Sequence, residues 1–411
     1  MSTGSAPTRE DALARDAADS LAGFRARFAH RDPATVYVDG NSLGRPPLAA
    51  ADALAAVADD WASRLVEGWE DWIGLPAGLG DRIAAGLVGA RPGEVVVCDS
   101  VTVNLFKLAG AALAARPQGV VLCDPEEFPT DRYVLAGLGR EVVDCAPTAE
   151  AVAAVAAERD VALAVFSLVD YRSGAKADLH GVTAEVHAAG GLMLWDLSHA
   201  VGSVAIDLEG AGADLATGCT YKYVGGGPGA PAFLYVRGGL LEDLHPPLQG
   251  WFGADDQFAM GPVYAPAPGI ARFLAGTPPI VSMAAIGPGV DLLAEAGMDA
   301  VQAKGEQLTQ LAIELADAWL APLGFTVGTP RDPAARGAHV ALRHPDAWRI
   351  CRALIERARV VPDFRRPDVV RFGFPALSTS FADVWDACDR LRDLMATGGH
   401  ELVDAAPRRV T

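Results

Sequence analysis

The chain of 411 residues has few basic residues and no long apolar run. It holds 34 Lys and Arg against 52 Asp and Glu, which gives a formal net charge of −18. Nucleic acid is bound by clustered positive charge, so this balance argues against a nucleic-acid partner. No stretch approaches the roughly 18 apolar residues of a membrane span, and the N-terminus lacks the apolar core of a signal peptide. We therefore expect a cytoplasmic protein with neither a membrane nor a nucleic-acid partner.

Paired cysteines are also missing. The six cysteines are scattered, no two of them form a C-x-x-C pair, and several lie in apolar runs. Buried, reduced thiols are therefore favoured over disulfides or metal ligands, and no metal site is expected.

Short apolar strands alternate with helices through the middle of the chain. At 51% hydrophobic residues, the chain is long enough for a large domain and a smaller one. The alternation predicts a parallel, doubly wound α/β sheet with ligand groups at the carboxyl ends of its strands. Residues 126–131 and 170–174 follow such strand ends, so we expect them on the functional edge. The strands expected are residues 95–98, 119–123, 141–143, 161–168, 192–196, 204–208 and 232–236, and a long helix is expected over residues 9–30.

Residues 191–229 carry the most specific chemistry. An apolar strand stops at Asp196, His199 follows three residues later, and Lys222 stands between short strands and a run of glycines. A lysine in such a place reacts with an aldehyde, and a buried carboxylate keeps a pyridinium nitrogen protonated. The stretch therefore predicts a pyridoxal 5′-phosphate (PLP) site built on Lys222 and Asp196. For His199, a core histidine that donates to a carbonyl is the alternative.

Two turns after strands carry hydroxyl or amide side chains. Residues 99–104 (DSVTVN) lead into an apolar helix, whose free N–H groups and hydroxyls can bind a phosphate. An ordinary helix cap is the alternative. Residues 39–44 (DGNSLG) form a turn in which Gly tolerates positive φ and Asp and Asn bond their own backbone. Its spacing leaves open whether that turn serves a ligand or only the fold.

Eight stretches resemble the kynureninases, which are PLP enzymes of the aspartate-aminotransferase fold type I. They are DGNSLG, VTVNLFK, FPTDRY, WDLSHAVG, YKYVGGGPGAPAFLYV, GWFG, PAPGIARFLAGTPPI and VRFGF, and they cover nearly the whole chain. The resemblance implies a mostly parallel, doubly wound sheet in a large domain and a small α/β domain formed by the C-terminal part and the N-terminal segment. The implied segments are residues 1–45, which contribute to the small domain and the active site, 46–295 and 296–411.

The resemblance also implies roles for single residues. Lys222 resembles the lysine that binds the cofactor aldehyde, Asp196 the partner of the pyridine nitrogen, and Tyr221 a further catalytic residue on the phosphate side. Further cofactor contacts are implied at Val101, Thr102, Phe128, Thr130, Asp131, His199, Trp251 and Thr277, with Thr277 supplied by the same or the other subunit. The implied substrate residues are Asn41, Ser42 and the carboxylate clamp Arg371, for which a surface arginine is the alternative.

The reaction that the resemblance implies is hydrolysis of the Cβ–Cγ bond of L-kynurenine, or of a ring-substituted kynurenine. The products are anthranilate or its analogue and L-alanine, as in tryptophan catabolism, and the implied assembly is a homodimer with shared active sites. Leu168, Ala254 and Ser378 stand where many relatives carry His, His and Tyr on the substrate side. These departures keep open a relative that acts on another γ-oxo or β-substituted amino acid in a specialised biosynthetic pathway. A desulfurase or lyase and a non-catalytic homologue are weaker alternatives.

Overall fold

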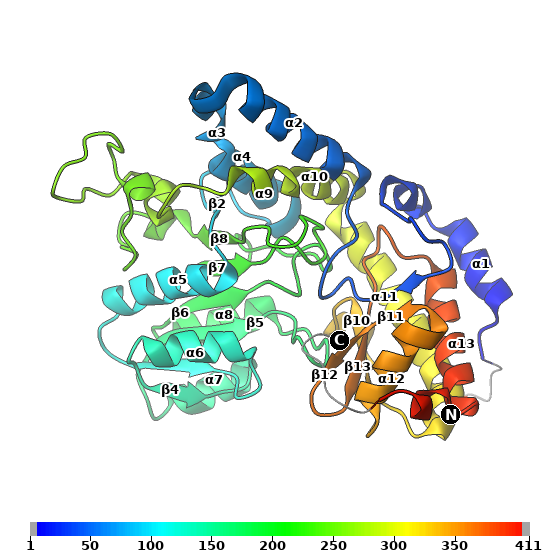
Figure 1. The fold of residues 1–411 in the computed structure, drawn as a ribbon. Helices are drawn as coiled ribbons and strands as arrows, with labels where there is room; N and C mark the ends of the chain where they lie inside the picture. Colours follow the sequence, from blue (N-terminus) through cyan, green and yellow to red (C-terminus); the bar gives the residue numbers. More distant parts are fainter. Residues whose placement is uncertain (1–5, 405–411) are drawn as a thin grey trace.

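The computed structural model describes residues 6–404, which form two lobes (Figure 1). The larger lobe contains seven strands: β2 (Val95–Val97), β3 (Val120–Cys123), β4 (Val142–Asp144), β5 (Val161–Ser167), β6 (Leu192–Asp196), β7 (Leu215–Gly218) and β8 (Phe233–Val236). They form one sheet in the order β2-β8-β7-β6-β5-β3-β4. Both pairs that involve β8 are antiparallel, and the other four are parallel. Most of these strands are apolar along their whole length, as strands buried on both faces must be.

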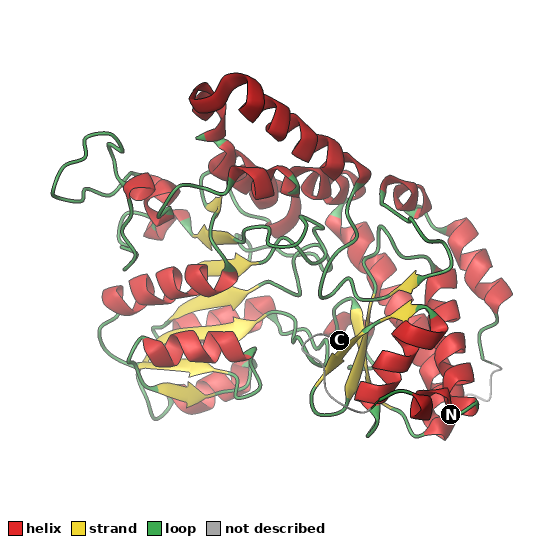
Figure 2. Ribbon diagram, in the orientation of Figure 1, coloured by secondary structure: helices red, strands yellow, loops and turns green. Residues whose placement is uncertain are grey.

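Helices cover both faces of this sheet, as Figure 2 shows. On one face lie α5 (Val101–Ala115) and α6 (Pro129–Gly137), whose buried side chains pack on β3, β5 and β7. On the other face lie α4 (Leu75–Ile83), α7 (Ala149–Ala156) and α8 (Leu179–Ala188). The sheet is therefore sealed, and polar groups reach a ligand only at the ends of its strands.

The smaller lobe is built on an antiparallel sheet. Its strands run in the order β12 (Asp363–Arg365), β13 (Val369–Gly373), β10 (His339–Arg343) and β9 (Thr326–Val327). Four helices share the core of this lobe: α1 (Arg9–Ala18), α11 (Met298–Leu315), α12 (Ala347–Ala353) and α13 (Phe381–Ala396).

The N-terminal segment joins the two lobes. Its strand β1 (Val36–Tyr37) pairs in parallel with β11 (Val360–Val361) in the smaller lobe. A few residues later the backbone N–H of Gly44 donates to the carbonyl of Tyr221, 2.9 Å away, in the larger lobe. Four helices lie in the upper part of Figure 1: α2 (Leu48–Arg64) and α3 (Trp69–Trp72), which follow this segment in the chain, and α9 (Ile280–Ala284) and α10 (Ile286–Ala296), which come much later.

The structure differs from the sequence-based expectations in two segments. The strand predicted over residues 204–208 is absent: the N–H of Val204 turns back to the carbonyl of Ala200, and no strand lies alongside. The helix predicted over residues 9–30 ends at Ala18, where the side chain of Asp19 accepts from the N–H of Leu21 and competes with the helix. A 3-10 turn, Ala22–Arg27, follows. The predicted segment boundaries at residues 45 and 295 stay a prediction.

Within the described part of the chain, no single helix is long and apolar enough to cross a membrane. One pair, Ile280–Ala296 and Met298–Leu323, meets the length and composition criteria only when its helices are taken together, and it is bent by 87°.

Replacing Gly44 by alanine tests the contact between the N-terminal segment and the larger lobe. A Cβ at Gly44 would lie 2.1 Å from the carbonyl oxygen of Lys222, so the backbone must move. We expect the free energy of unfolding to fall by about 1–3 kcal/mol, as for other overpacked sites. The matched control is Gly23→Ala, where no atom lies within 4 Å. Urea unfolding of both variants measures the difference, and equal stabilities would contradict this packing.

Candidate active site

A cavity of about 560 Å³ opens at the carboxyl ends of β5 and β6 and the N-termini of α5 and α6. Its position follows from the sheet, because the last residues of β5 and β6 are Ser167 and Asp196, side by side in the register. Ten of the residues predicted to bind a cofactor line this cavity: Val101, Thr102, Phe128, Thr130, Asp131, Asp196, His199, Tyr221, Lys222 and Thr277. A single chain therefore brings them together.

Lys222 reaches the cavity from the turn after β7. Its Nζ lies 2.9 Å from Nε2 of His199, and burial lowers the pKa of Lys222. Burial and the adjacent Lys222 also hold the pKa of His199 well below its ordinary value. An amine with a lowered pKa is more often neutral, which is the form that attacks an aldehyde. The pair is therefore suited to a nucleophilic lysine.

Two buried carboxyl groups face Lys222 across the cavity. Asp196 accepts from the N–H of Ser198 at 2.7 Å, whereas both carboxyl oxygens of Asp131 lack a hydrogen-bond partner among the described residues. Burial, and then the charge of Asp196, raises the pKa of Asp131 well above its ordinary value. The hydroxyl of Ser198 and Nδ1 of His199 are likewise unpaired within residues 6–404. Buried polar atoms without partners are costly, so this chemistry fits a polar, positively charged ring in the cavity.

The N-terminus of α5 supplies an anion site in the same cavity. Ser100 caps this 15-residue helix by accepting from the N–H of Val103, and Val101 and Thr102 form its first turn. The free N–H groups and the helix dipole favour a phosphate there. Phe128 contributes an aromatic wall and packs edge-on against Tyr171, with ring centroids 5.3 Å apart.

The residues predicted to bind substrate lie beside the cavity rather than on its lining. Arg371 is fully buried, so it is not a surface arginine, and its guanidinium forms a bidentate pair with Asp363. Ser42 donates to the same carboxylate at 2.5 Å. Burial alone would raise the pKa of Asp363, but the charge and hydrogen bonds of Arg371 hold it at about 2. Asn41 is fully buried with both amide atoms unpaired in the described structure.

Trp251 is the one predicted cofactor residue that does not line this cavity. Its ring packs edge-on against Phe252, with centroids 4.5 Å apart, and it remains 40% exposed. The three departures from the expected pattern also lie off the cavity: Leu168 is 2% exposed within the hydrophobic core, Ser378 is buried, and Ala254 pairs with Pro266. They therefore do not line the cavity of a single chain.

The sequence predicted no role for Ser167, Asp363 or His339, and it placed Glu127 only on the functional edge of the sheet. Ser167 lines the cavity, and its place at a strand end was a usable signal. Glu127 accepts hydrogen bonds from Ser167. His339 is fully buried, with its ring centroid 5.4 Å from that of His199. Asp363 belongs to a short strand that carries no clear pattern.

The cysteines do not offer a mobile thiol. All six are free and buried, and burial raises the pKa of Cys351 on α12. Among residues 6–404, no group of three or more His, Cys, Asp or Glu is placed to hold a metal ion.

Two family models and relatives along nearly the whole chain match this sequence. The model of the kynureninase C-terminal domain matches residues 301–391, and that of class-V aminotransferases matches residues 146–343. The kynureninase of Pseudomonas fluorescens is 42% identical over 401 residues, which cover 94% of this chain and 95% of the relative. The kynureninase of Burkholderia pseudomallei (strain K96243) is 41% identical over 418 residues, which cover 98% and 99%.

Solved structures share the fold at low identity. A cysteine desulfurase from Thermococcus onnurineus superposes with a TM-score of 0.74 at 16% identity, over 88% of this chain and 95% of that one. A variant of C-DES with glycine covalently linked to its PLP cofactor gives 0.77 at 16% identity, over 90% and 99%. These matches confirm the predicted fold type.

Asp363→Asn tests the buried ion pair. The change leaves the Arg371 charge buried with a neutral partner, so we expect the free energy of unfolding to fall by about 3–5 kcal/mol near neutral pH. Because the pKa of Asp363 is depressed to about 2, the contribution of the pair is present above the ordinary aspartate pKa and is lost as the pH falls through about 2.

The control for this variant is Glu295→Gln. It removes an ion pair to Arg27 whose two side chains are about half exposed, and such pairs contribute at most about 1 kcal/mol. Urea unfolding at neutral pH compares the two. A loss below 1 kcal/mol in Asp363→Asn would contradict the buried pair.

Proposed function

The chain belongs to the kynureninase family, and we propose that it is a PLP-dependent enzyme that hydrolyses the Cβ–Cγ bond of L-kynurenine or a ring-substituted kynurenine. The products would be anthranilate, or its analogue, and L-alanine. The observation that carries the proposal is the meeting of Lys222, Asp196 and the N-terminus of α5 in one cavity. A volume of about 560 Å³ suits a cofactor and a small amino acid together.

Each part of PLP has a group suited to it. Lys222 would join the aldehyde, Asp196 would face the pyridine nitrogen, and Val101 and Thr102 at the start of α5 would hold the phosphate. Phe128 would stack on the ring, with Thr130, Asp131, His199 and Thr277 completing the wall. When bound, PLP supplies an electron sink for charge that develops on the substrate.

The side chains of this chain would bind the substrate and move its protons. The amine of Lys222 is the base for the proton on Cα, since burial lowers the pKa of Lys222. Burial raises the pKa of Tyr221, so its hydroxyl stays protonated and can donate. Asp196 would face the ring nitrogen and help to hold a proton there. Arg371 would bind the substrate carboxylate through its guanidinium, which now donates to Asp363. Asn41 and Ser42 lie next to it.

We also propose a cytoplasmic homodimer with shared active sites, acting in tryptophan catabolism. Trp251 supports sharing because it is 40% exposed and lies off the cavity of its own chain. An apolar hollow of about 670 Å³ nearby, lined by Trp61, Trp69, Trp72 and Val281 among others, supports a partner surface. Thr277 lines the cavity of its own chain, so Trp251 is the residue that we expect a partner to supply.

Turnover of L-kynurenine is the direct test of the proposed function. With PLP-loaded enzyme we expect anthranilate, followed by its fluorescence, and one alanine for each anthranilate. Cofactor binding without product would favour a different γ-oxo or β-substituted amino acid as substrate. A colourless protein that cannot be reconstituted with PLP would contradict the proposal.

Lys222→Ala should lower turnover by at least about 10³-fold, since it removes both the attachment point and the base. Borohydride should fix the cofactor to the wild-type chain but not to this variant, as mass spectrometry reports. Asp196→Ala should bind PLP weakly and lose nearly all turnover. Lys176→Ala is the control lysine, because Lys176 does not line this cavity, and it should keep both turnover and attachment.

Mixing Lys222→Ala and Trp251→Ala chains tests the shared site. If Trp251 is supplied by a partner, each mixed dimer holds one intact site, and a random mixture recovers about a quarter of wild-type activity. If Trp251 serves its own chain, no intact site forms and the mixture shows no gain over its components. Light scattering on the same samples gives the oligomeric state.

A further inference from the structure

Glu127 forms a clamp directly behind the candidate active site. Its Oε1 accepts from the Ser167 hydroxyl at 2.5 Å and from the N–H of Phe128 at 2.9 Å, and its Oε2 accepts from the N–H of Ser167 at 2.7 Å. The residue is 6% exposed. These three bonds tie the end of β5 to the start of α6, and both Ser167 and Phe128 line the active-site cavity.

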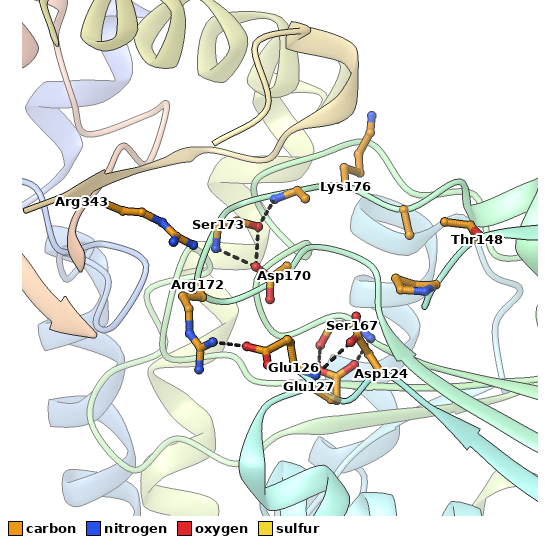
Figure 3. Close-up of a pocket in the computed structure, with 13 residues that line it drawn as sticks. Asp124, Glu126, Glu127, Thr148, Ser167, Asp170, Arg172, Ser173, Lys176 and Arg343 are labelled. Atoms are coloured by element: carbon orange, nitrogen blue, oxygen red, sulfur yellow. Dashed lines mark hydrogen bonds and ion pairs between the residues drawn. The ribbon is translucent and has the colours of Figure 1, made fainter. Parts of the chain in front are cut away.

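A second cavity lies on the other side of this clamp. It has a volume of about 430 Å³, and its lining includes Glu127 and Ser167, while the active-site lining includes Ser167 but not Glu127. Figure 3 shows the carboxyl group of Glu127 joined to Ser167 in the second cavity. Ser167 therefore separates the two cavities, and Glu127 can exchange protons with solvent without passing through the active site.

The surroundings of Glu127 hold more acids than bases. It forms no ion pair in the part of the chain that the structure describes, and it interacts electrostatically with Cys123, Asp131 and Asp196. Asp124 lies beside Glu127, since the N–H of Glu127 donates to its carbonyl at 3.1 Å. The rest of the second cavity's lining includes Asp170 and the cations Arg172, Lys176 and Arg343. Arg172 is held by Glu126, and Lys176 points away from Glu127 in Figure 3. Burial raises the pKa of Glu127 to about 7, against the hydrogen bonds that it accepts.

The direction of the Ser167 hydroxyl depends on the charge of this clamp. When the carboxylate is ionised it only accepts, so the Ser167 proton points at Glu127 and the oxygen lone pairs face the active-site cavity. When the carboxyl is protonated, its own O–H can donate to the Ser167 oxygen, and the Ser167 proton is free to turn toward the cavity. The N–H of Ser167 keeps an acceptor in both states.

We propose that Glu127 is a positioning residue whose protonation decides whether Ser167 offers PLP a hydrogen-bond acceptor or a donor. The proposal rests on the proposed function only in taking PLP as the group that Ser167 meets. The proton comes from water in the second cavity and returns to it, so no bond of the substrate is involved. Cofactor affinity should therefore change with pH near neutrality because Glu127, which does not line the active-site cavity, changes its protonation state.

The first test uses the protein without cofactor. ¹³C NMR of glutamate side-chain carboxyls, with the signal of Glu127 identified by its loss in Glu127→Gln, gives the titration midpoint. We expect a midpoint near 7, against about 4.3 for an ordinary glutamate. In Ser167→Ala the midpoint should rise further, because a hydrogen bond that favours the ionised form is removed. A wild-type midpoint below about 5, or a fall in Ser167→Ala, would overturn the proposal.

The second test measures PLP affinity against pH. Between pH 6 and 8 the wild-type dissociation constant should change by roughly 2- to 10-fold through this group, the range for one hydrogen bond. Glu127→Gln, which is always neutral, and Ser167→Ala, which lacks the hydroxyl, should both lose that component. Glu295→Gln is the matched control: its ion pair with Arg27 is about half exposed and lines neither cavity, so it should keep the wild-type profile.

The outcomes separate this proposal from the proposed function. A Ser167→Ala profile identical to that of the wild type would end the proposal even if kynurenine is cleaved. If kynurenine is not cleaved but the midpoint and the affinity profiles behave as described, the clamp stands and the substrate assignment fails. Should Glu127→Gln fold poorly, Ser167→Ala and selective labelling of the wild-type chain still decide the matter.

Discussion

The structure depends on placing several carboxyl groups around one amine in a buried space. Asp131, Asp196 and Glu127 lie close together at neighbouring strand and helix ends, and Lys222 is the nearest cation on the cavity lining. Buried like charges repel, and burial penalises each of them, so the protein alone leaves this cluster short of positive charge. On the proposed assignment, the protonated pyridine ring of PLP would supply that charge. The loaded site would then be more stable than the protein alone.

The smaller lobe also buries charged side chains, but there they neutralise each other. Arg371 and Asp363 neutralise each other in the interior, with Ser42 from the N-terminal segment bonded to both. The three carboxyl groups around the cavity in the larger lobe have no such partner among the described residues, whereas this pair needs no ligand. A substrate carboxylate that approached Arg371 would compete with Asp363, so discrimination between ligands would depend on how readily that carboxylate releases part of the guanidinium.

The sequence predicts the strands, which show as apolar runs, and the polar residues that stand where these runs end. The strands rich in Val and Leu occur where expected, and the residues at their ends, such as Asp196, meet in one cavity because parallel strands share an edge. Pairings between distant side chains leave no such trace. Arg371 pairs with Asp363, which lies on a short strand whose sequence does not alternate between apolar and polar residues. His339 contacts His199 from the other lobe. The segment at 204–208 is apolar like a strand but packs as turns, because it has no neighbouring strand to bond.

The pairing of β1 with β11 can form only late in the synthesis of this chain. Residues 36 and 37 are made early, yet their partners at 360 and 361 leave the ribosome only near the end of translation. The loop between them spans most of the chain and contains every strand of the larger sheet, so all of those strands are synthesised before it can close. Until then the DGNSLG turn has no fixed place beside Lys222. A nascent or C-terminally truncated chain would hold Lys222 without the fixed segment that packs against the backbone of residues 221 and 222.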